Sequence, residues 1–276
     1  MLTDDLQKQL AHRLGVLTAK PESSTLHVHP LCNFNKDEDK NINSVTTDRS
    51  KNPAENRHKI QASRRHGVRG NWHMDLGYEP NPSDYTILKL IELPESGGGT
   101  MFASSCEIYD RISPAYRQFL EGLTITCSQG NYHKILAEKG FEPYSAPRGS
   151  PNNVGARFEA VHPMVRTNPV TGWKSLCSVG HHFSHVNELT ATESTRLHDW
   201  LLQILVESDD CQLRHRWCNS YDIAIWDNRS VFHRAVVDFE GIRTARRAVG
   251  IGERPYFDPN SKTRREAIAE EECGEP

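Results

Sequence analysis

The sequence predicts a mainly β domain with flanking helices, of the α+β class, in which short strands form a sandwich or barrel. Short β-branched or alternating segments bounded by Gly, Pro and Asn recur along the second half of the chain. Only a few longer stretches have the periodicity of an amphipathic helix. With 276 residues and a mass of 31.3 kDa, residues 1–276 fit one domain with a sizeable core.

The composition predicts a soluble protein of the cytoplasm. A net charge of −3 gives no reason to expect nucleic acid as a partner. No apolar run reaches the roughly 18 residues of a membrane helix, so we expect no membrane partner either. Met1 is followed by polar and acidic residues, unlike a secretory signal. The seven cysteines lack CxxC spacing, which indicates reduced thiols.

The N-terminal residues 2–15 predict an amphipathic helix. Thr3 is a suitable N-cap, and Gly15 is a suitable C-terminal stop. Leucines recur at every fourth position and predict one apolar stripe, formed by Leu6, Leu10 and Leu14. Residues 26–30 alternate and end at Pro30, which is typical of a short strand.

Residues 33–70 are polar and have almost no apolar periodicity, so they cannot bury a core. We expect a long surface loop or lid over this range. This range contains a basic cluster of Arg64, Arg65, His66 and Arg69. The cluster is either a solvated face or a contact to an anionic substrate.

Beyond this loop, residues 85–93 predict a strand, and Pro114 opens a helix. Residues 130–153 are irregular and predict a second loop at the rim of a site. Thr190 and Glu193 form a capping box for a long helix. Strands are predicted at residues 161–166, 175–179, 213–217, 222–226, 231–236 and 246–251. The charged tail from about residue 259 is predicted to be frayed.

The chemistry centres on His73 and Asp75, which would share one face of an extended strand. With His233 they provide two histidines and one carboxylate, the facial triad that holds non-haem iron(II). A His-x-Asp triplet by itself has a high false-positive risk in a chain with 14 histidines. Its interpretation therefore depends on the residues that accompany it.

Arginines that follow His233 support this interpretation. In an extended segment Arg243 and Arg247 share a face, and Arg246 points away. A guanidinium is the expected partner of a carboxylate, because it donates two parallel charge-assisted hydrogen bonds. Such an arginine near a metal triad suits a keto-acid that chelates iron at one end and binds arginine at the other.

Several motifs, in one order along the chain, resemble the taurine dioxygenase family of iron(II)/2-oxoglutarate-dependent oxygenases. They are Leu26-His27-Val28-His29-Pro30, Trp72-His73-Met74-Asp75, Glu92-Leu93-Pro94, Gly97-Gly98-Gly99-Thr100, residues 162–172, Arg216-Trp217, and residues 222–229 with His233. The resemblance extends to about Phe257. It implies a double-stranded β-helix, a jelly-roll core with helices packed on one side.

The resemblance implies that His73, Asp75 and His233 are the iron ligands and form the catalytic centre. It also implies that Arg243 binds the distal carboxylate of 2-oxoglutarate, with a hydrogen bond from Thr100.

For the organic substrate, the resemblance implies that His29 and Arg247 bind an anionic group, as in sulfonate-binding members. Cys32 and Arg69 stand where taurine-specific members have tyrosine and asparagine. Phe102 stands where tryptophan is usual. The resemblance therefore does not extend to taurine itself, and Arg69 becomes a candidate substrate contact.

The implied activity is hydroxylation of a small anionic substrate (a sulfonate, sulfate ester or carboxylate) with iron(II), 2-oxoglutarate and O2. Succinate and carbon dioxide would be released. The family carries a leading segment of strands and a helix before the position of Leu2, and we expect this chain to lack it. The sequence leaves open whether the protein is a monomer or a homo-oligomer.

Other functions stay open. One is a hydroxylase or desaturase of a secondary-metabolite pathway with the same iron chemistry, and another is a non-catalytic truncated relative. A zinc hydrolase or cupin-like binding module could use the same sandwich. The cluster His181-His182-x-x-His185 suggests zinc, but no carboxylate or cysteine is spaced to complete such a site.

Overall fold

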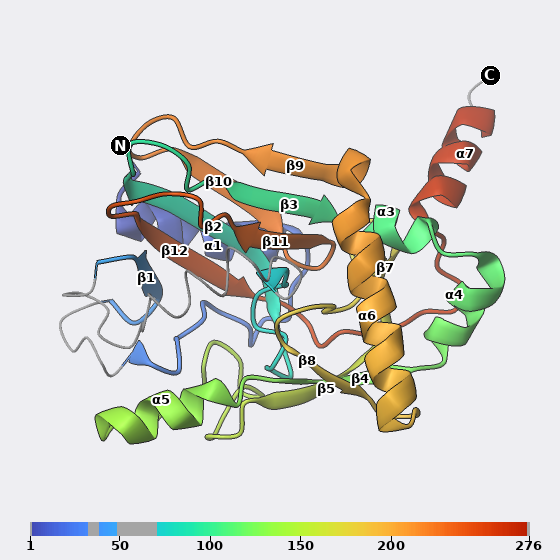
Figure 1. The fold of residues 1–276 in the computed structure, drawn as a ribbon, viewed down its shortest axis with the longest axis horizontal. Helices are drawn as coiled ribbons and strands as arrows, with labels where there is room; N and C mark the ends of the chain where they lie inside the picture. Colours follow the sequence, from blue (N-terminus) through green and yellow to red (C-terminus); the bar gives the residue numbers. More distant parts are fainter. Residues whose placement is uncertain (1, 33–38, 49–70, 275–276) are drawn as a thin grey trace.

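The computed structural model describes residues 2–32, 39–48 and 71–274, with antiparallel sheets at its centre (Figure 1). The largest sheet has the order β1-β12-β2-β10, formed by Ile42–Thr46, Thr244–Ile251, Ser83–Glu92 and Ile223–Asp227. A second sheet has the order β11-β3-β9, formed by Val231–Ala235, Thr100–Ser104 and Gln212–His215. An isolated antiparallel bridge between His73 and His233 joins the segment around His73 to β11.

Smaller sheets and helices surround this centre. One small sheet has the order β5-β4-β8 (Glu159–Pro163, Thr124–Ser128 and Phe183–Val186), and another pairs β6 Val165–Thr167 with β7 Lys174–Leu176. The remaining helices are α3 Ser105–Asp110, α4 Pro114–Glu121, α5 Asn131–Lys139, α6 Ala191–Glu207, the 3-10 helix η3 Asp209–Cys211, and α7 Arg264–Gly274. The predicted combination of short strands and flanking helices is confirmed. No helix in the described ranges has both the length and the apolar character needed to cross a membrane.

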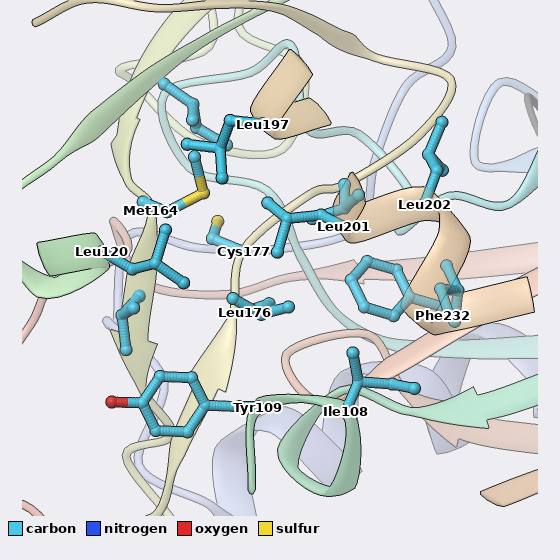
Figure 2. Packing of buried hydrophobic residues seen from close by; sticks show 14 of the residues in the cluster. Ile108, Tyr109, Leu120, Met164, Leu176, Cys177, Leu197, Leu201, Leu202 and Phe232 are labelled. Atoms are coloured by element: carbon cyan, nitrogen blue, oxygen red, sulfur yellow. The ribbon is translucent and has the colours of Figure 1, made fainter. Parts of the chain in front are cut away.

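The main hydrophobic core lies between α6 and the strands beside it (Figure 2). Leu197, Leu201 and Leu205 of α6 are buried, and they belong to one cluster with Met164 and Phe232. Burial of a leucine side chain stabilises a fold by about 1.5–3 kcal/mol. The predicted capping box is present. The Thr190 hydroxyl accepts a hydrogen bond from the Glu193 backbone N–H, and the Thr190 backbone N–H donates to the Glu193 carboxylate.

Helix α1, Asp4–Leu17, begins as predicted, and the Thr3 side chain accepts a hydrogen bond from the Leu6 backbone N–H. The predicted stop at Gly15 is wrong, because the helix continues to Leu17. The predicted leucine stripe is confirmed only in part. Leu10 and Leu14 pack, partly buried, against the core beneath the helix, but Leu6 is 48% exposed. The fully buried residues of α1 are Gln7, Ala11 and Gly15.

Small side chains on α1 allow a close approach to the largest sheet, which explains this buried face. A Cβ atom on Gly15 would lie 2.3 Å from the Oδ2 atom of Asp84. Ala11 is 0% exposed, and the Gln7 side-chain amide donates hydrogen bonds to backbone carbonyls of β2 and β12. The helix therefore packs through its smallest residues and one hydrogen-bonded amide.

The predicted loop of residues 33–70 is wrong at β1, which pairs with β12 along its whole length. Ile42 is buried with Ile87 and Ala248 beneath α1. Few apolar residues mark this strand, because its stability comes from the partner strand rather than from its own pattern. The predicted contact Arg69 and the rest of its basic cluster lie outside the described residues.

The predicted frayed tail is also wrong, since α7 occupies residues 264–274. Thr263 and Glu266 hydrogen-bond reciprocally through backbone and side chain, as in a capping box. Arg264 and Arg265 then form ion pairs with Glu107 of α3. The motif T-x-x-E at residues 263–266 is the sequence signal that marks this helix.

Candidate metal centre and substrate cavity

The two histidines of the predicted triad face each other across a backbone pair. His73 N–H donates to the His233 carbonyl at 3.0 Å, and His233 N–H donates to the His73 carbonyl at 2.9 Å. Asp75 Oδ1 lies 3.8 Å from His73 Nε2, and Asp75 Oδ2 lies 3.7 Å from His233 Nε2. The ligand atoms of the three side chains all lie within 4.8 Å of one another. The structure therefore brings the predicted triad together.

The protonation of these side chains fits a metal site. His73 Nδ1 lies 3.0 Å from the Asn71 carbonyl oxygen, which can only accept, so Nδ1 carries the proton and Nε2 offers a lone pair. Burial, together with His73, lowers the pKa of His233 to about 3, so this ring is neutral at pH 7. Two imidazole nitrogens and one carboxylate match the donor set of non-haem iron(II).

Asp75 is 3% exposed and has a partner on each carboxylate oxygen. Arg247 Nη1 donates to Oδ1 at 2.6 Å, and Thr86 Oγ1 donates to Oδ2 at 2.9 Å. Burial alone would raise the pKa of Asp75, but the Arg247 guanidinium and the neighbouring histidines hold it well below its ordinary value. The carboxylate is therefore ionised, as a metal ligand must be.

Asn228 fixes the orientation of this carboxylate, although the sequence did not single it out. Its Nδ2 donates to Thr86 Oγ1 at 2.6 Å and to Ser83 Oγ at 2.9 Å. Because the Thr86 oxygen accepts from Asn228, its own proton is directed at Asp75. Asn228 Oδ1 also accepts from the Asp75 backbone N–H at 3.1 Å. Its position inside the motif at residues 222–229 was the available signal.

Arg243 and Thr100 lie together, as the resemblance implied. Arg243 is 5% exposed, and it donates to the Gly98 carbonyl at 2.9 Å and to Thr100 Oγ1 at 3.5 Å. Burial lowers the pKa of Arg243 to about 10, so the guanidinium is still charged at pH 7. It has no ion-pair partner within the described ranges, and a buried charge without one is costly.

The Thr100 hydroxyl is prepared as a donor. Its oxygen accepts from Trp217 Nε1 at 3.1 Å as well as from Arg243, which leaves its proton for another acceptor. Thr100 is opposite Ala235 in the β3–β11 register, and Phe102 is opposite His233. Thr100 and His233 therefore project from the same face of this sheet.

A cavity of about 220 Å³ opens beside the triad. Its lining residues are Asn71, His73, Asp75, Leu76, Tyr78, Gln129, Tyr132, His181, His182, Ala235 and Arg247. The predicted rim at residues 130–153 does contribute Tyr132, from the first turn of α5. The prediction that residues 130–153 are irregular is wrong over α5. His29, Thr100 and Arg243 do not line this cavity, although His29 Nε2 lies 3.2 Å from the Tyr132 hydroxyl.

The histidine cluster considered for zinc contributes to the same cavity. His182 is 6% exposed, and its ring centroid lies 6.1 Å from that of His73. His185 is exposed on β8. Within the described ranges, the triad is the group of His, Cys, Asp or Glu side chains that meets the geometry of a metal site.

Comparison with known proteins agrees with this site. The family described as taurine catabolism dioxygenase TauD, TfdA family matches residues 2–249. The alpha-ketoglutarate-dependent dioxygenase esdpJ of Penicillium shearii is 50% identical, over 98% of this chain and 80% of its own length. An alpha-ketoglutarate-dependent sulfonate dioxygenase of Saccharomyces cerevisiae is 36% identical, over 68% of this chain and 44% of its own.

The fold has relatives among solved structures. The crystal structure of a taurine dioxygenase from Burkholderia xenovorans superposes with a TM-score of 0.63 at 21% identity, over 86% of this chain and 71% of that chain. This likeness concerns the fold, and it confirms the expected jelly-roll core with flanking helices. From the family match and the 50% identical relative, the chain belongs to the TauD, TfdA family and is a 2-oxoglutarate-dependent dioxygenase that uses iron(II) and O2.

Proposed function

We propose that this dioxygenase hydroxylates a small anionic organic substrate, a sulfonate, sulfate ester or carboxylate, and releases succinate and carbon dioxide. The observation that carries the proposal is the triad of His73, Asp75 and His233 beside a cavity that also contains Arg247. The sulfonate named for the yeast relative supports the same substrate class.

In this proposal His73, Asp75 and His233 hold the iron, which activates O2 when bound. Arg243 and the Thr100 hydroxyl bind the distal carboxylate of 2-oxoglutarate, which neutralises the buried guanidinium. Arg247 contributes positive charge to the cavity that receives the organic substrate, and His29 lies beside the hydroxyl of Tyr132, a residue that lines this cavity. Arg69 remains a predicted contact.

A second candidate is a hydroxylase or desaturase of a neutral substrate that uses the same iron chemistry, as in a secondary-metabolite pathway. One observation favours it. The charge of Arg247 is already opposed by Asp75 at 2.6 Å. Burial and the nearby Arg247 lower the pKa of His29 to about 3, so His29 adds no charge at pH 7. An anionic group would then bind without a dedicated cation.

Anaerobic addition of iron(II) and 2-oxoglutarate tests the metal and cosubstrate sites. We expect a weak metal-to-ligand charge-transfer absorption in the visible, and His73→Ala should remove both this band and succinate release. Folded protein that shows no such band would contradict the assignment of the cosubstrate site.

A succinate-release screen then separates the two substrate classes. The panel contains sulfonates, sulfate esters, aryloxy acids and amino acids, together with uncharged esters of the same acids. Turnover of the acids but not of their esters supports an anionic substrate. Turnover of the esters alone supports the second candidate.

A further inference from the structure

Tyr132 is a cavity residue whose ring and hydroxyl both contact neighbouring side chains. Its ring packs edge-on against Tyr78, with centroids 5.6 Å apart, and against Phe158, with centroids 5.5 Å apart. Phe158 is 2% exposed, so the ring is held by buried aromatic side chains. The hydroxyl oxygen lies 3.2 Å from His29 Nε2.

The tautomer of His29 follows from its other nitrogen. The Leu31 backbone N–H donates to His29 Nδ1 at 3.1 Å, so Nδ1 carries no proton. A neutral imidazole then has its proton on Nε2, the atom that faces Tyr132. The low pKa of His29, caused by burial and by Arg247, keeps the ring in this neutral form. His29 therefore donates to the Tyr132 oxygen.

Burial raises the pKa of Tyr132, so the hydroxyl keeps its proton at pH 7. With its oxygen occupied as an acceptor, the Tyr132 hydroxyl can still donate its own proton. Tyr132 lines the cavity that contains His73 and Asp75, so this proton is available to a molecule bound there.

We propose that Tyr132 is a specificity-determining residue, whose hydroxyl donates to an oxygen of the organic substrate, and that His29 is the positioning residue that fixes Tyr132 as the donor. The proposal rests on the proposed function, because it concerns the substrate of the same site. It differs from the sequence prediction that His29 binds the substrate itself. The acceptor is a carboxylate, sulfonate, sulfate or carbonyl oxygen.

A double-mutant cycle separates the two roles of His29. The variants are Tyr132→Phe, His29→Leu and their combination, with His29→Gln as a conservative variant that places an amide N–H near the position of Nε2. Tyr256→Phe, at a tyrosine that is 43% exposed, is the matched control. The probes are phenoxyacetate, its methyl ester, hexyl sulfate and pentane-1-sulfonate.

Two readouts are measured for each protein. Anaerobic titration of the iron(II)–2-oxoglutarate enzyme follows the charge-transfer band and yields the dissociation constant of each probe. Calorimetry on the metal-free protein repeats the titration without the cosubstrate. The affinity for 2-oxoglutarate itself shows whether a variant has kept its active site.

We expect Tyr132→Phe to weaken probe binding by about 10- to 100-fold, the usual effect of losing a hydrogen bond to a charged acceptor. His29→Leu should weaken it to a similar extent, but should add less than about twofold in the Tyr132→Phe background. His29→Gln should restore most of the affinity, and 2-oxoglutarate binding should stay within about twofold throughout. If the unmodified enzyme binds the three anionic probes but not the methyl ester, the acceptor on the substrate is an anionic oxygen.

If the losses of probe affinity in Tyr132→Phe and His29→Leu multiply in the double variant, the proposal is overturned, because His29 would then contact the substrate directly. Unchanged probe binding in Tyr132→Phe, or no binding of any probe to the unmodified enzyme, would overturn it as well. The charge-transfer band and the succinate-release screen test the proposed function separately, so failure of this proposal can be distinguished from failure of that function. Absence of the band would instead contradict the proposed function.

Discussion

Asp75 shows how the fold prepares a single carboxylate. Its partners come from different strands of the largest sheet, Thr86 from β2 and Arg247 from β12, and Asn228 follows β10. Thr86 and Asn228 are 0% and 1% exposed, so water does not compete for these hydrogen bonds. Side chains that hydrogen-bond a carboxylate in this way fix the direction in which it would bind a metal.

Replacement of Thr86 by valine tests this arrangement at nearly constant volume. The Asp75 Oδ2 atom would lose its donor, and we expect iron(II) to bind about 10- to 100-fold more weakly. A competition titration with a chelator under anaerobic conditions measures the affinity. Thr167→Val is the control, since Thr167 is 3% exposed and hydrogen-bonds to Ser261 and the Asp258 backbone rather than to the triad. Equal affinities in the two variants would contradict the proposed role of Thr86.

Arg243→Gln tests the cosubstrate site. The variant removes a buried guanidinium that has no ion-pair partner within the described ranges. We expect the KM for 2-oxoglutarate to rise at least about tenfold, because a bidentate charge-assisted contact is lost. Arg246→Gln is the control on the same stretch, since Arg246 pairs with Asp4 of α1 on the opposite face of the sheet. If Arg243→Gln instead changed only the KM for the organic substrate, the roles assigned to Arg243 and Arg247 would have to be exchanged.

At the scale of elements, periodicity identified helices better than it identified their buried faces. The apolar residues of α4 have helical spacing, yet Leu120 is 0% exposed whereas Tyr116 and Phe119 are 41% and 44% exposed. Tyr116 instead packs against Trp200 of α6, with ring centroids 4.6 Å apart. The face that a helix buries depends on which elements lie beside it, and a local pattern does not contain that information.

Leu201→Ala tests the packing of α6 against the core. Leu201 is 0% exposed in the main cluster, and its truncation should lower the free energy of unfolding by about 2–5 kcal/mol. Urea denaturation measures this change. Leu213→Ala on β9 is the control, because Leu213 is 62% exposed and its loss should cost less than about 0.5 kcal/mol. Similar losses in both variants would show that Leu201 is not part of the core in solution.

At the scale of the whole molecule, Asp84 connects α1 to the largest sheet. A Cβ atom on Gly15 of α1 or on Gly250 of β12 would lie 2.3 Å from a carboxylate oxygen of Asp84. The Asp84 backbone carbonyl also accepts from Asn228 N–H at 2.7 Å, so this junction adjoins the residues that hold Asp75. Burial raises the pKa of Asp84 from its ordinary 3.8 to about 6.

This pKa predicts a dependence of stability on pH. Because the folded state binds the Asp84 proton more tightly than the unfolded state, this group lowers the free energy of unfolding as pH rises between about 4 and 6. Asp84→Asn removes the effect, so the stability of the variant relative to the unmodified protein should rise by about 2–3 kcal/mol from pH 4 to pH 7. Urea denaturation at several pH values measures the difference. A constant difference in stability between the two proteins over this pH range would contradict the raised pKa of Asp84.

Much of the site was predictable because its chemistry is local in sequence. His73 and Asp75 share one short motif, and the spacing of Arg243, Arg246 and Arg247 correctly placed Arg246 on the opposite face of the sheet. Tyr132 and Asn228 were not identified as functional. Their roles depend on contacts with His29 and Thr86, which are more than a hundred residues away in sequence.

Residue type, spacing and period were enough to predict the mainly β class with flanking helices, the grouping of His73, Asp75 and His233, and the arginines that accompany them. Tertiary structure alone decided that β1 and α7 form, that α1 packs through Gln7, Ala11 and Gly15, and that Tyr132 lines the cavity. Each of these features depends on a partner that is distant in sequence. Strand β1 needs the hydrogen bonds of β12, and α7 needs Glu107 of α3 as the partner of its arginines. Helix α1 needs a sheet surface that admits only small side chains, and Tyr132 needs His29.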